Sequence, residues 1–447
     1  MASAAEQLAQ SLNWGAFSKA EDLKKRLWFT LGALIVYRIG TYIPIPGIDP
    51  GILKEIFETQ RGGILGMFDM FSGGALGRMT LFALNIMPYI TAAIIIQLMT
   101  AVSPTLEALK KEGEAGRKTL NQYTRYLTLL LAIFQSFGIA VGLEGMRGSV
   151  GLAVIDPGWF FRFTCVVTLT GGTMFLMWLG EQITQRGVGN GISLIIFAGI
   201  VANLPTALGA TLEMGRTGAL STFIILVLLA MSVLVVMAIV FVERAQRRIL
   251  VQYPKRQVGN KMFGGESSHL PLKLNTSGVI PPIFASSLLL LPLTFANFNQ
   301  NNEIAWLTWL TSNLAHGQPI YIALYVALIV FFAFFYTAVV FNPVETADNL
   351  KKYGGFVPGI RPGKNTADYL DYVLTRLTVV GAGYLAAVCV LPEILISQYS
   401  VPFYFGGTSL LIVVSVTMDT VAQVHSHLLA HQYEGLVKKA KLRGTRK

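Results

Sequence analysis

Few side chains in this sequence have the types and spacing needed to catalyse a reaction. The sequence contains no HExxH, GxSxG or P-loop motif and no pair of aspartates within an apolar stretch, which argues against the common hydrolytic and nucleotide-hydrolysing centres. His425 and His427 are two residues apart and would face different ways on a helix, and no third ligand is evident beside His427 and His431. We therefore expect no enzyme activity, no metal site and no cofactor.

The remaining reactive side chains have simple structural interpretations. Cys165 and Cys389 lie in apolar runs and form no CxxC motif, which favours small buried packing residues. Glu181 lies close to Arg186 in sequence, and we interpret the two as a structural pair. Asp419 lies inside an apolar stretch, where a mid-membrane carboxylate costs roughly 2.5–3.5 kcal/mol. It is equally compatible with a structural contact near the cytoplasmic end and with a role in an ion pathway.

Isoleucines recur beside residues that break or kink helices. Such isoleucines are most often core or lipid-facing residues, but a ring of branched apolar side chains can also gate a pore by excluding water and ions. Pro88 is expected to kink the helix that contains it. The recurrent positions are Ile86 and Ile90 around Pro88, Ile192 and Ile196 after Gly189-Asn190-Gly191, Ile283 after Pro281-Pro282, and Ile412 after Gly406-Gly407.

The segment 62–75 is apolar, rich in Met and Phe, bracketed by glycine pairs and too short to span a membrane. One interpretation is a re-entrant helix that lies at the membrane interface. The other is a small helix that fills a cavity and swings on Gly73 and Gly74, because glycine permits backbone conformations that other residues avoid.

The composition indicates that lipid surrounds most of the chain. Of its 447 residues, 53% are hydrophobic and only 13% are charged, with a mean hydropathy of +0.56, whereas soluble domains carry roughly 25% charged residues. Residues 1–22 lack the features of a cleavable signal peptide. Stretches of about 20 apolar residues cross a bilayer as helices, and ten are expected: 27–46, 76–102, 126–143, 159–180, 188–208, 219–242, 275–298, 319–341, 373–392 and 408–430.

The positions of the basic residues predict the orientation. With the N-terminus inside, 28 of the 35 Lys and Arg residues fall in the inner segments 1–26, 103–125, 181–187, 243–274, 342–376 and 431–447. This asymmetry predicts that both termini are cytoplasmic. It also explains the net charge of +11 through topology and attraction to anionic lipids, without DNA. Arg38 and Arg162 lie toward the outer ends of their spans and can snorkel. The long inner loops 243–274 and 342–372 are candidates for partner docking.

Five spans before residue 210 and five after it favour two inverted halves. The expected organisation is a cytoplasmic segment 1–26, an N-terminal half 27–208, a C-terminal half 209–430 and a basic tail 431–447. A small-solute transporter with inverted repeats is the alternative function. It would need a polar site at mid-membrane, for which the sequence offers only Asp419 and scattered Asn, Gln and Thr residues.

Several motifs resemble those of the SecY family of protein-translocation channels, in family order, over about residues 20–440. They are GTYIPIPG at 40–47, MFSGGA at 70–75, IMPYI at 86–90, GEQIT at 180–184, GNGIS at 189–193, NPVETADNL at 342–350, FVPGIRPG at 356–363 and FGGTSLLI at 405–412. The bacterial branch is the closer match.

The resemblance implies an all-α membrane protein with ten transmembrane helices, arranged as a clamshell of two inverted five-helix halves around an hourglass pore. A short re-entrant plug helix would close this pore. The implied pore ring is Ile86, Ile90, Ile192, Ile196, Ile283 and Ile412. The implied plug residues are Phe68, Met70, Phe71, Gly73 and Gly74. A lateral gate would lie between spans two and three on one side and seven and eight on the other, with Thr91 and Asn275 at gate positions.

The resemblance also implies the partners and the location. SecE and SecG would complete the complex, while the SecA ATPase or a translating ribosome would drive signal peptides and unfolded preproteins through it. The expected location is the bacterial inner membrane. The implied docking residues are Arg247, Arg248, Lys255, Arg256 and Arg361. Three positions depart from the family pattern and are expected to tune gate opening: Asn85 where glycine is common, Pro282 where alanine is common, and Leu291 where some relatives have a bulky aromatic.

Overall fold

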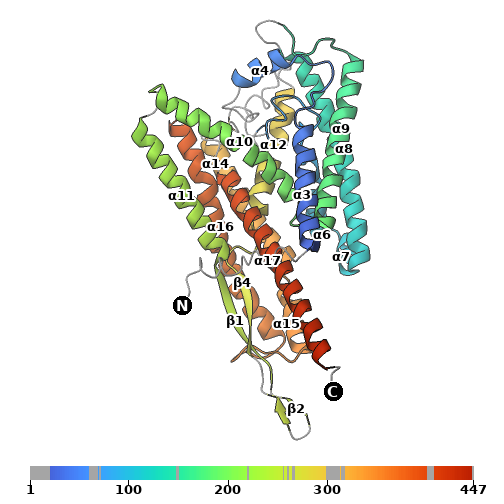
Figure 1. The fold of residues 1–447 in the computed structure, drawn as a ribbon, viewed down its shortest axis with the longest axis vertical. Coiled ribbons are helices and arrows are strands. Elements are labelled where there is room, and N and C mark those ends of the chain that lie inside the picture. Colours follow the sequence, from blue (N-terminus) through green and yellow to red (C-terminus); the bar gives the residue numbers. More distant parts are fainter. Residues whose placement is uncertain are drawn as a thin grey trace. The chain divides into compact units, whose positions relative to one another are not determined.

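The computed structural model describes residues 21–59, 69, 72–146, 151–218, 221–254, 256–258, 261–263, 267–298, 313, 318–399 and 407–444. Helices dominate this part of the chain (Figure 1). It divides into two compact units, and each is described by itself. Unit 1 contains residues 1–96, 117–206 and 412–447, and unit 2 contains residues 97–116 and 207–411. The units are therefore interleaved in sequence, whereas the expected halves were consecutive.

The helices of unit 1 are mostly long and apolar. The α3 helix packs against α9, and Leu23, Val188 and Leu428 form a small buried cluster at their inner ends. The helices that lie in or enter this unit are α3 (Glu21–Gly40), α4 (Pro50–Thr59), α6 (Met87–Val102), α8 (Glu114–Gly145), α9 (Trp159–Arg186), α10 (Gly191–Arg216) and α17 (Gly407–Gly444).

Unit 2 combines apolar helices with a β-ribbon. The α14 helix packs against both α12 and α16, and Phe284 meets Phe332 edge to face at 5.6 Å between ring centroids. The elements are α7 (Pro104–Lys111), α11 (Thr222–Arg244), β1 (Gln246–Gln252), β2 (Arg256–Val258), β3 (Lys261–Phe263), β4 (Ser267–Lys273), α12 (Ile280–Phe298), α14 (Pro319–Val340), α15 (Pro343–Lys352) and α16 (Lys364–Tyr399).

Fewer described helices are long and apolar enough to span a membrane than the sequence predicts. Each of the ten expected stretches contains a helix. Among the described residues, seven helices are long and apolar enough to cross a membrane, or eight if the pair α6 and α7, bent by 99°, counts as one span. The ten-helix count therefore stays a prediction.

The second expected span, 76–102, was wrong in its first eleven residues. Residues 76–86 form turns, and α6 begins only at Met87. Met79 and Asn85 have positive φ angles of 44° and 49°, which a regular right-handed helix does not contain. Pro88 therefore lies in the first turn of α6, where its missing N–H is tolerated, and does not kink a continuous helix.

The loop 243–274, predicted to lie on the inner side, folds into two antiparallel strand pairs that the sequence did not predict. The β1 strand pairs with β4 from Gln246↔Lys273 to Gln252↔Ser267, and β2 pairs with β3. Burial along β1 alternates at its end, with Ile249 and Val251 buried between exposed neighbours. This alternation is typical of a strand with one covered face. The sequence does not show it, because Ile249, Leu250 and Val251 form a continuous apolar run.

Candidate functional site

Five of the six predicted pore-ring isoleucines belong to unit 1. Ile86, Ile90, Ile196 and Ile412 are between 1% and 6% exposed, and Ile192 is half-buried. Ile283 is also half-buried, but it lies on α12 in unit 2. A closed ring of all six side chains therefore stays a prediction.

The turns that precede α6 and α10 set the positions of four of these isoleucines. Ile90 donates its backbone N–H to the Ile86 carbonyl at 3.0 Å, so the two side chains stand one turn apart. Ile192 donates its N–H to the Asn190 side chain at 3.1 Å, which caps the first turn of α10. Gly189 has a φ of +89°, and its N–H donates to Gln423 of α17 at 2.9 Å. The cap and this tie to α17 are features that the motif alone did not reveal.

Glycines on α9 and at the start of α10 let neighbouring backbone approach closely. A Cβ atom at Gly172 would lie 2.0 Å from the Leu81 carbonyl oxygen. A Cβ atom at Gly191 would lie 1.9 Å from the carbonyl oxygen of Gly180. Because real Cβ atoms essentially never come closer than 3.0 Å to other atoms, only glycine fits at these positions. The α9 helix thus supports both the irregular segment before Ile86 and the start of α10.

Two arginines hold the Gly73–Gly74 turn. Arg38 donates to the Gly73 carbonyl at 2.8 Å, and Arg78 donates to the carbonyls of Gly74 at 2.8 Å and Gly73 at 3.2 Å. Tyr42 joins them: Arg38 donates to its hydroxyl at 3.0 Å, and the Arg78 guanidinium lies 4.2 Å from its ring centroid. Gly73 and Gly74 have φ angles of +69° and +83°, where other residues are strained. The predicted plug residues Phe68, Met70 and Phe71 lie outside the described residues.

Ion pairs neutralise several arginines of the spanning helices. Arg125 of α8 donates to both carboxylate oxygens of Glu181, at 3.0 and 2.6 Å. The expected pairing of Glu181 with Arg186 was therefore wrong, because a neighbouring helix offers a bidentate partner. Arg162 pairs with Glu144 at 2.6 Å.

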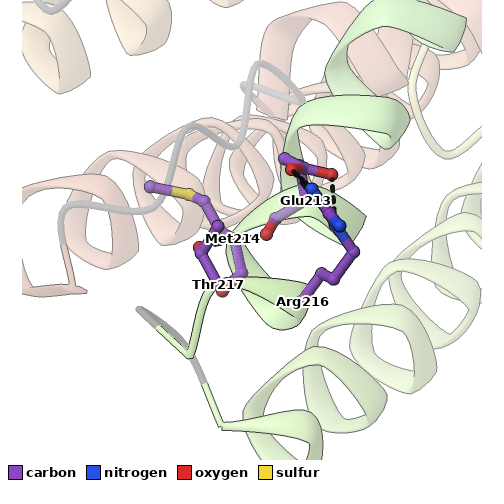
Figure 2. Close-up of polar contacts among 4 residues, drawn as sticks. All are labelled: Glu213, Met214, Arg216 and Thr217. Atoms are coloured by element: carbon purple, nitrogen blue, oxygen red, sulfur yellow. Dashed lines mark hydrogen bonds and ion pairs between the residues drawn. The ribbon is translucent and has the colours of Figure 1, made fainter.

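The C-terminal end of α10 carries a further pair. Figure 2 shows Arg216 paired with Glu213 at 2.6 Å, while the Thr217 hydroxyl donates to the carbonyls of Glu213 and Met214. Arg216 is one of the few basic residues that the predicted orientation places outside.

The two predicted docking loops join in one folded surface of unit 2. Gln252 at the end of β1 exchanges two backbone hydrogen bonds of 2.9 Å with Phe356 of the 342–372 loop. Beneath them, side chains from both loops and from α16 form one buried cluster: Ile249, Leu272, Val357, Leu370 and Val373. In Figure 1 the β1–β4 ribbon and α15 accordingly lie at the same end of α16.

The charged residues of this surface face outward. Arg247, Arg248 and Arg361 are exposed, as a docking role requires. Arg256 lies in β2, and Lys255 lies outside the described residues.

The residues predicted for the lateral gate are buried. Thr91 on α6 is 5% exposed, and its hydroxyl donates to the Met87 carbonyl at 3.1 Å. Asn275 of unit 2 is 3% exposed and lies just before α12. Because the two residues belong to different units, their pairing across a gate stays a prediction.

The structure also shows the environments of the residues considered for an ion pathway, a metal site or reactive thiols. Asp419, His425 and His427 are exposed on α17, and within the described ranges no group of three or more His, Cys, Asp or Glu side chains could hold a metal ion. Cys165 and Cys389 are buried, which confirms their interpretation as packing residues.

Three residues depart from the family pattern. Asn85 adopts a left-handed φ of 49°, which explains why glycine suits this position. Pro282 is buried, and no side-chain environment is described for Leu291.

A family model describing SecY matches residues 80–421, which is more than half of the chain. The chain belongs to the SecY family. It is 58% identical over 429 residues to the protein translocase subunit SecY of Rickettsia felis (strain ATCC VR-1525 / URRWXCal2), and the match covers 96% of this chain and 99% of that protein. It is 59% identical over 424 residues to the protein translocase subunit SecY of Escherichia coli (strain K12), with 95% and 96% covered.

Solved structures of SecY and Sec61 channels share the fold. One of them is a SecY structure whose plug domain is described as stabilising the closed state of the translocation channel. It matches with a TM-score of 0.64 at 19% identity, and the match covers 91% of this chain and 92% of that one. Sec61 in the canine ribosome-channel complex matches with a TM-score of 0.62 at 18% identity, again covering 91% and 92%. The predicted family and channel fold class are thus confirmed, and the chain is an integral membrane protein.

Proposed function

We propose that this chain is the pore-forming subunit of a protein-conducting channel. It would move unfolded secretory proteins across the bacterial inner membrane and release apolar segments sideways into the lipid. The observation that carries this proposal is the match to protein translocase subunits named SecY at 58–59% identity over 95% or more of the chain.

The pore-ring isoleucines support a gate that excludes water without binding its cargo. Branched apolar side chains contact any unfolded chain without preference, and they leave no polar site for ions when they close. A transporter would instead need a buried polar site near mid-membrane. Asp419, the one candidate that the sequence offered for such a site, is exposed on α17, which favours the channel over the transporter.

The clamped Gly73–Gly74 turn supports a plug with a defined resting position. Both glycines have backbone angles that permit a sharp reversal, and both carbonyls are held by arginines. A segment of 62–75 that fills the pore at rest would pivot at this turn, and the arginines would set the energy needed to move it.

The joined surface of ribbon and loop supports docking of an external motor. Lipid-facing helices supply no source of energy, so SecA or a translating ribosome would push the preprotein. Exposed arginines suit both partners, because guanidinium groups fork onto SecA carboxylates and attract ribosomal RNA phosphates. SecE and SecG would complete the complex. Apolar segments would leave through the lateral gate because they partition into lipid, with both termini of the chain in the cytoplasm.

The test is protease protection of a signal-bearing preprotein in liposomes that contain this chain with SecE, SecG, SecA and ATP. We expect ATP-dependent protection that is lost in Arg361→Glu and kept in Lys54→Glu. The second variant is the control, because it makes the same charge change on α4, a helix that the predicted orientation places outside. Absence of protection in the unmodified protein, with SecA bound and active, would contradict the channel function. Equal loss in both variants would contradict docking at Arg361.

A further inference from the structure

The base of the β1–β4 ribbon contains a carboxylate to which the channel function proposed above gives no role. Glu243 lies in the last turn of α11, directly before the ribbon. Its Oε1 accepts a hydrogen bond of 2.7 Å from the side-chain amide of Asn275, which lies directly after the ribbon. A carboxylate in the last turn of a helix opposes the helix dipole. Helix stability therefore does not account for this residue, whereas its contact with Asn275 does.

The Asn275 carboxamide is fixed at both ends. Its amide also donates to the Gly278 carbonyl at 3.1 Å, and its Oδ1 accepts from the Ser277 hydroxyl at 3.0 Å. The side chain is 3% exposed, so water does not compete freely for these bonds. Hydrogen bonds to an ionised acceptor are roughly twice as strong as neutral ones. At 2.7 Å, the bond to Glu243 is also the shortest of the three that hold this carboxamide.

The backbone around Asn275 is restrained as well. Leu274 donates its N–H to the Ala245 carbonyl at 2.9 Å, which extends the pairing of β1 and β4 by one step toward the membrane helices. A Cβ atom at Gly381 of α16 would lie 2.9 Å from the Leu274 carbonyl oxygen, so this junction rests directly on α16. Hydrogen bonds and packing therefore restrain the segment 274–279, which connects the ribbon to α12. Ile283 follows in the first turn of that helix.

We propose that Glu243 is a positioning residue that couples the docking ribbon to α12. By holding Asn275, it makes the ribbon and the start of α12 move as one piece, so that a force applied by a docked motor reaches the helix that bears Ile283. This inference rests on the proposed channel function. It adds that the coupling depends on the hydrogen bonds that hold the Asn275 carboxamide at the base of the ribbon, of which the bond to Glu243 is the shortest. Glu243 itself lies outside both the pore ring and the docking residues.

The test separates binding of the motor from transport by the motor. In reconstituted liposomes with SecE and SecG, SecA affinity and the transport rate at saturating SecA are measured for Glu243→Leu and Glu243→Gln. The leucine removes the acceptor, whereas the glutamine keeps a carbonyl oxygen in its place. We expect unchanged SecA affinity in both variants, a transport rate lowered about three- to tenfold in Glu243→Leu, and recovery of most of that loss in Glu243→Gln.

A double-mutant cycle then tests whether Glu243 acts through Asn275. If it does, Glu243→Leu combined with Asn275→Leu transports no more slowly than the worse single variant. Multiplied losses in the double variant, equal losses in the leucine and glutamine variants, or a loss of SecA affinity would each overturn the proposal. Failure of the unmodified protein to transport would instead overturn the channel function itself.

A milder variant keeps the test valid if Glu243→Leu does not fold. Ser277→Ala removes the hydroxyl that holds the other end of the same carboxamide, while the rest of the junction remains. We expect the same pattern with a smaller loss: unchanged SecA affinity and slower transport. Transport at the unmodified rate in Ser277→Ala would overturn the proposal, whatever the fate of the leucine variant.

Discussion

Two adjacent glycines of α9 allow a sharp test of how the irregular segment before Ile86 is supported. Nothing lies within 4 Å of a Cβ atom placed at Gly171, whereas a Cβ atom at Gly172 would lie 2.0 Å from the Leu81 carbonyl oxygen and 3.0 Å from its carbon. Gly171→Ala and Gly172→Ala therefore make the same chemical change in the same helix. Only the second forces the neighbouring backbone to move.

The size of the effect follows from these distances. The contact at Gly172 must open from 2.0 Å to at least 3.0 Å, so Leu81 or α9 must shift by about 1 Å. Overpacking of this kind costs about 1–3 kcal/mol. Both variants also gain helix propensity, up to about 1 kcal/mol. We thus expect Gly171→Ala to be as stable as the unmodified protein or slightly more so, and Gly172→Ala to be about 1–3 kcal/mol less stable than Gly171→Ala.

The two native cysteines provide the assay. Cys165 and Cys389 are 0% and 1% exposed, so a thiol-reactive fluorophore reports unfolding during a thermal ramp in detergent. Ion conductance of the resting channel is the second readout, because a shift at Leu81 is passed along the segment to Ile86. We expect Gly172→Ala alone to unfold earlier and to leak ions. Equal midpoints and equal conductance for the two variants would refute the close approach of α9 to this segment.

Four further substitutions have defined outcomes. Arg125→Gln and Glu181→Gln should each lower stability by about 1 kcal/mol, and the double variant should recover part of that loss. The bond is bidentate, but Arg125 is 41% exposed and solvent screening weakens it; the thiol assay measures it, and additive losses would contradict the pairing. Asn85→Gly should raise stability by up to about 1 kcal/mol, because glycine accepts a φ of 49° without strain; a lower unfolding midpoint would contradict this. Arg78→Gln should raise the ion conductance of the resting channel, because the Gly73–Gly74 turn loses one of its two clamps; unchanged conductance would contradict the clamp.

The sequence predicted the membrane-spanning character of the chain because that property depends on composition and on runs of apolar residues. A helix lies in each of the ten expected stretches, and motif order was sufficient to predict the family. Boundaries were predicted less well. The stretch 76–86 is as apolar as a helix, but hydropathy carries no information on the left-handed angles of Met79 and Asn85. These angles depend on tertiary contacts, such as the approach of Gly172 to Leu81.

Pairing between distant residues was the part that sequence reasoning could not supply. Glu181 was assigned to Arg186 because that residue is near in sequence, whereas Arg125 lies opposite it on α8. The bond between Glu243 and Asn275 joins residues that lie on either side of the ribbon in the sequence. The two docking loops meet at Gln252 and Phe356, which depends on the fold of both loops. The strand in 246–252 carried no alternation in its sequence, because its apolar residues Ile249, Leu250 and Val251 are consecutive and only the fold leaves Leu250 exposed.

In the proposed channel, a translocating chain passes the isoleucines at the starts of α6, α10 and α12. The most direct measurement is disulfide cross-linking of a preprotein, arrested in transit with a single cysteine, to Ile90→Cys, Ile192→Cys and Ile283→Cys. The exposed α11 position Phe241→Cys serves as the control. We expect cross-links at all three isoleucine positions that require SecA and ATP, and none at Phe241. Cross-links at Phe241 but at none of the isoleucines would contradict this proposal.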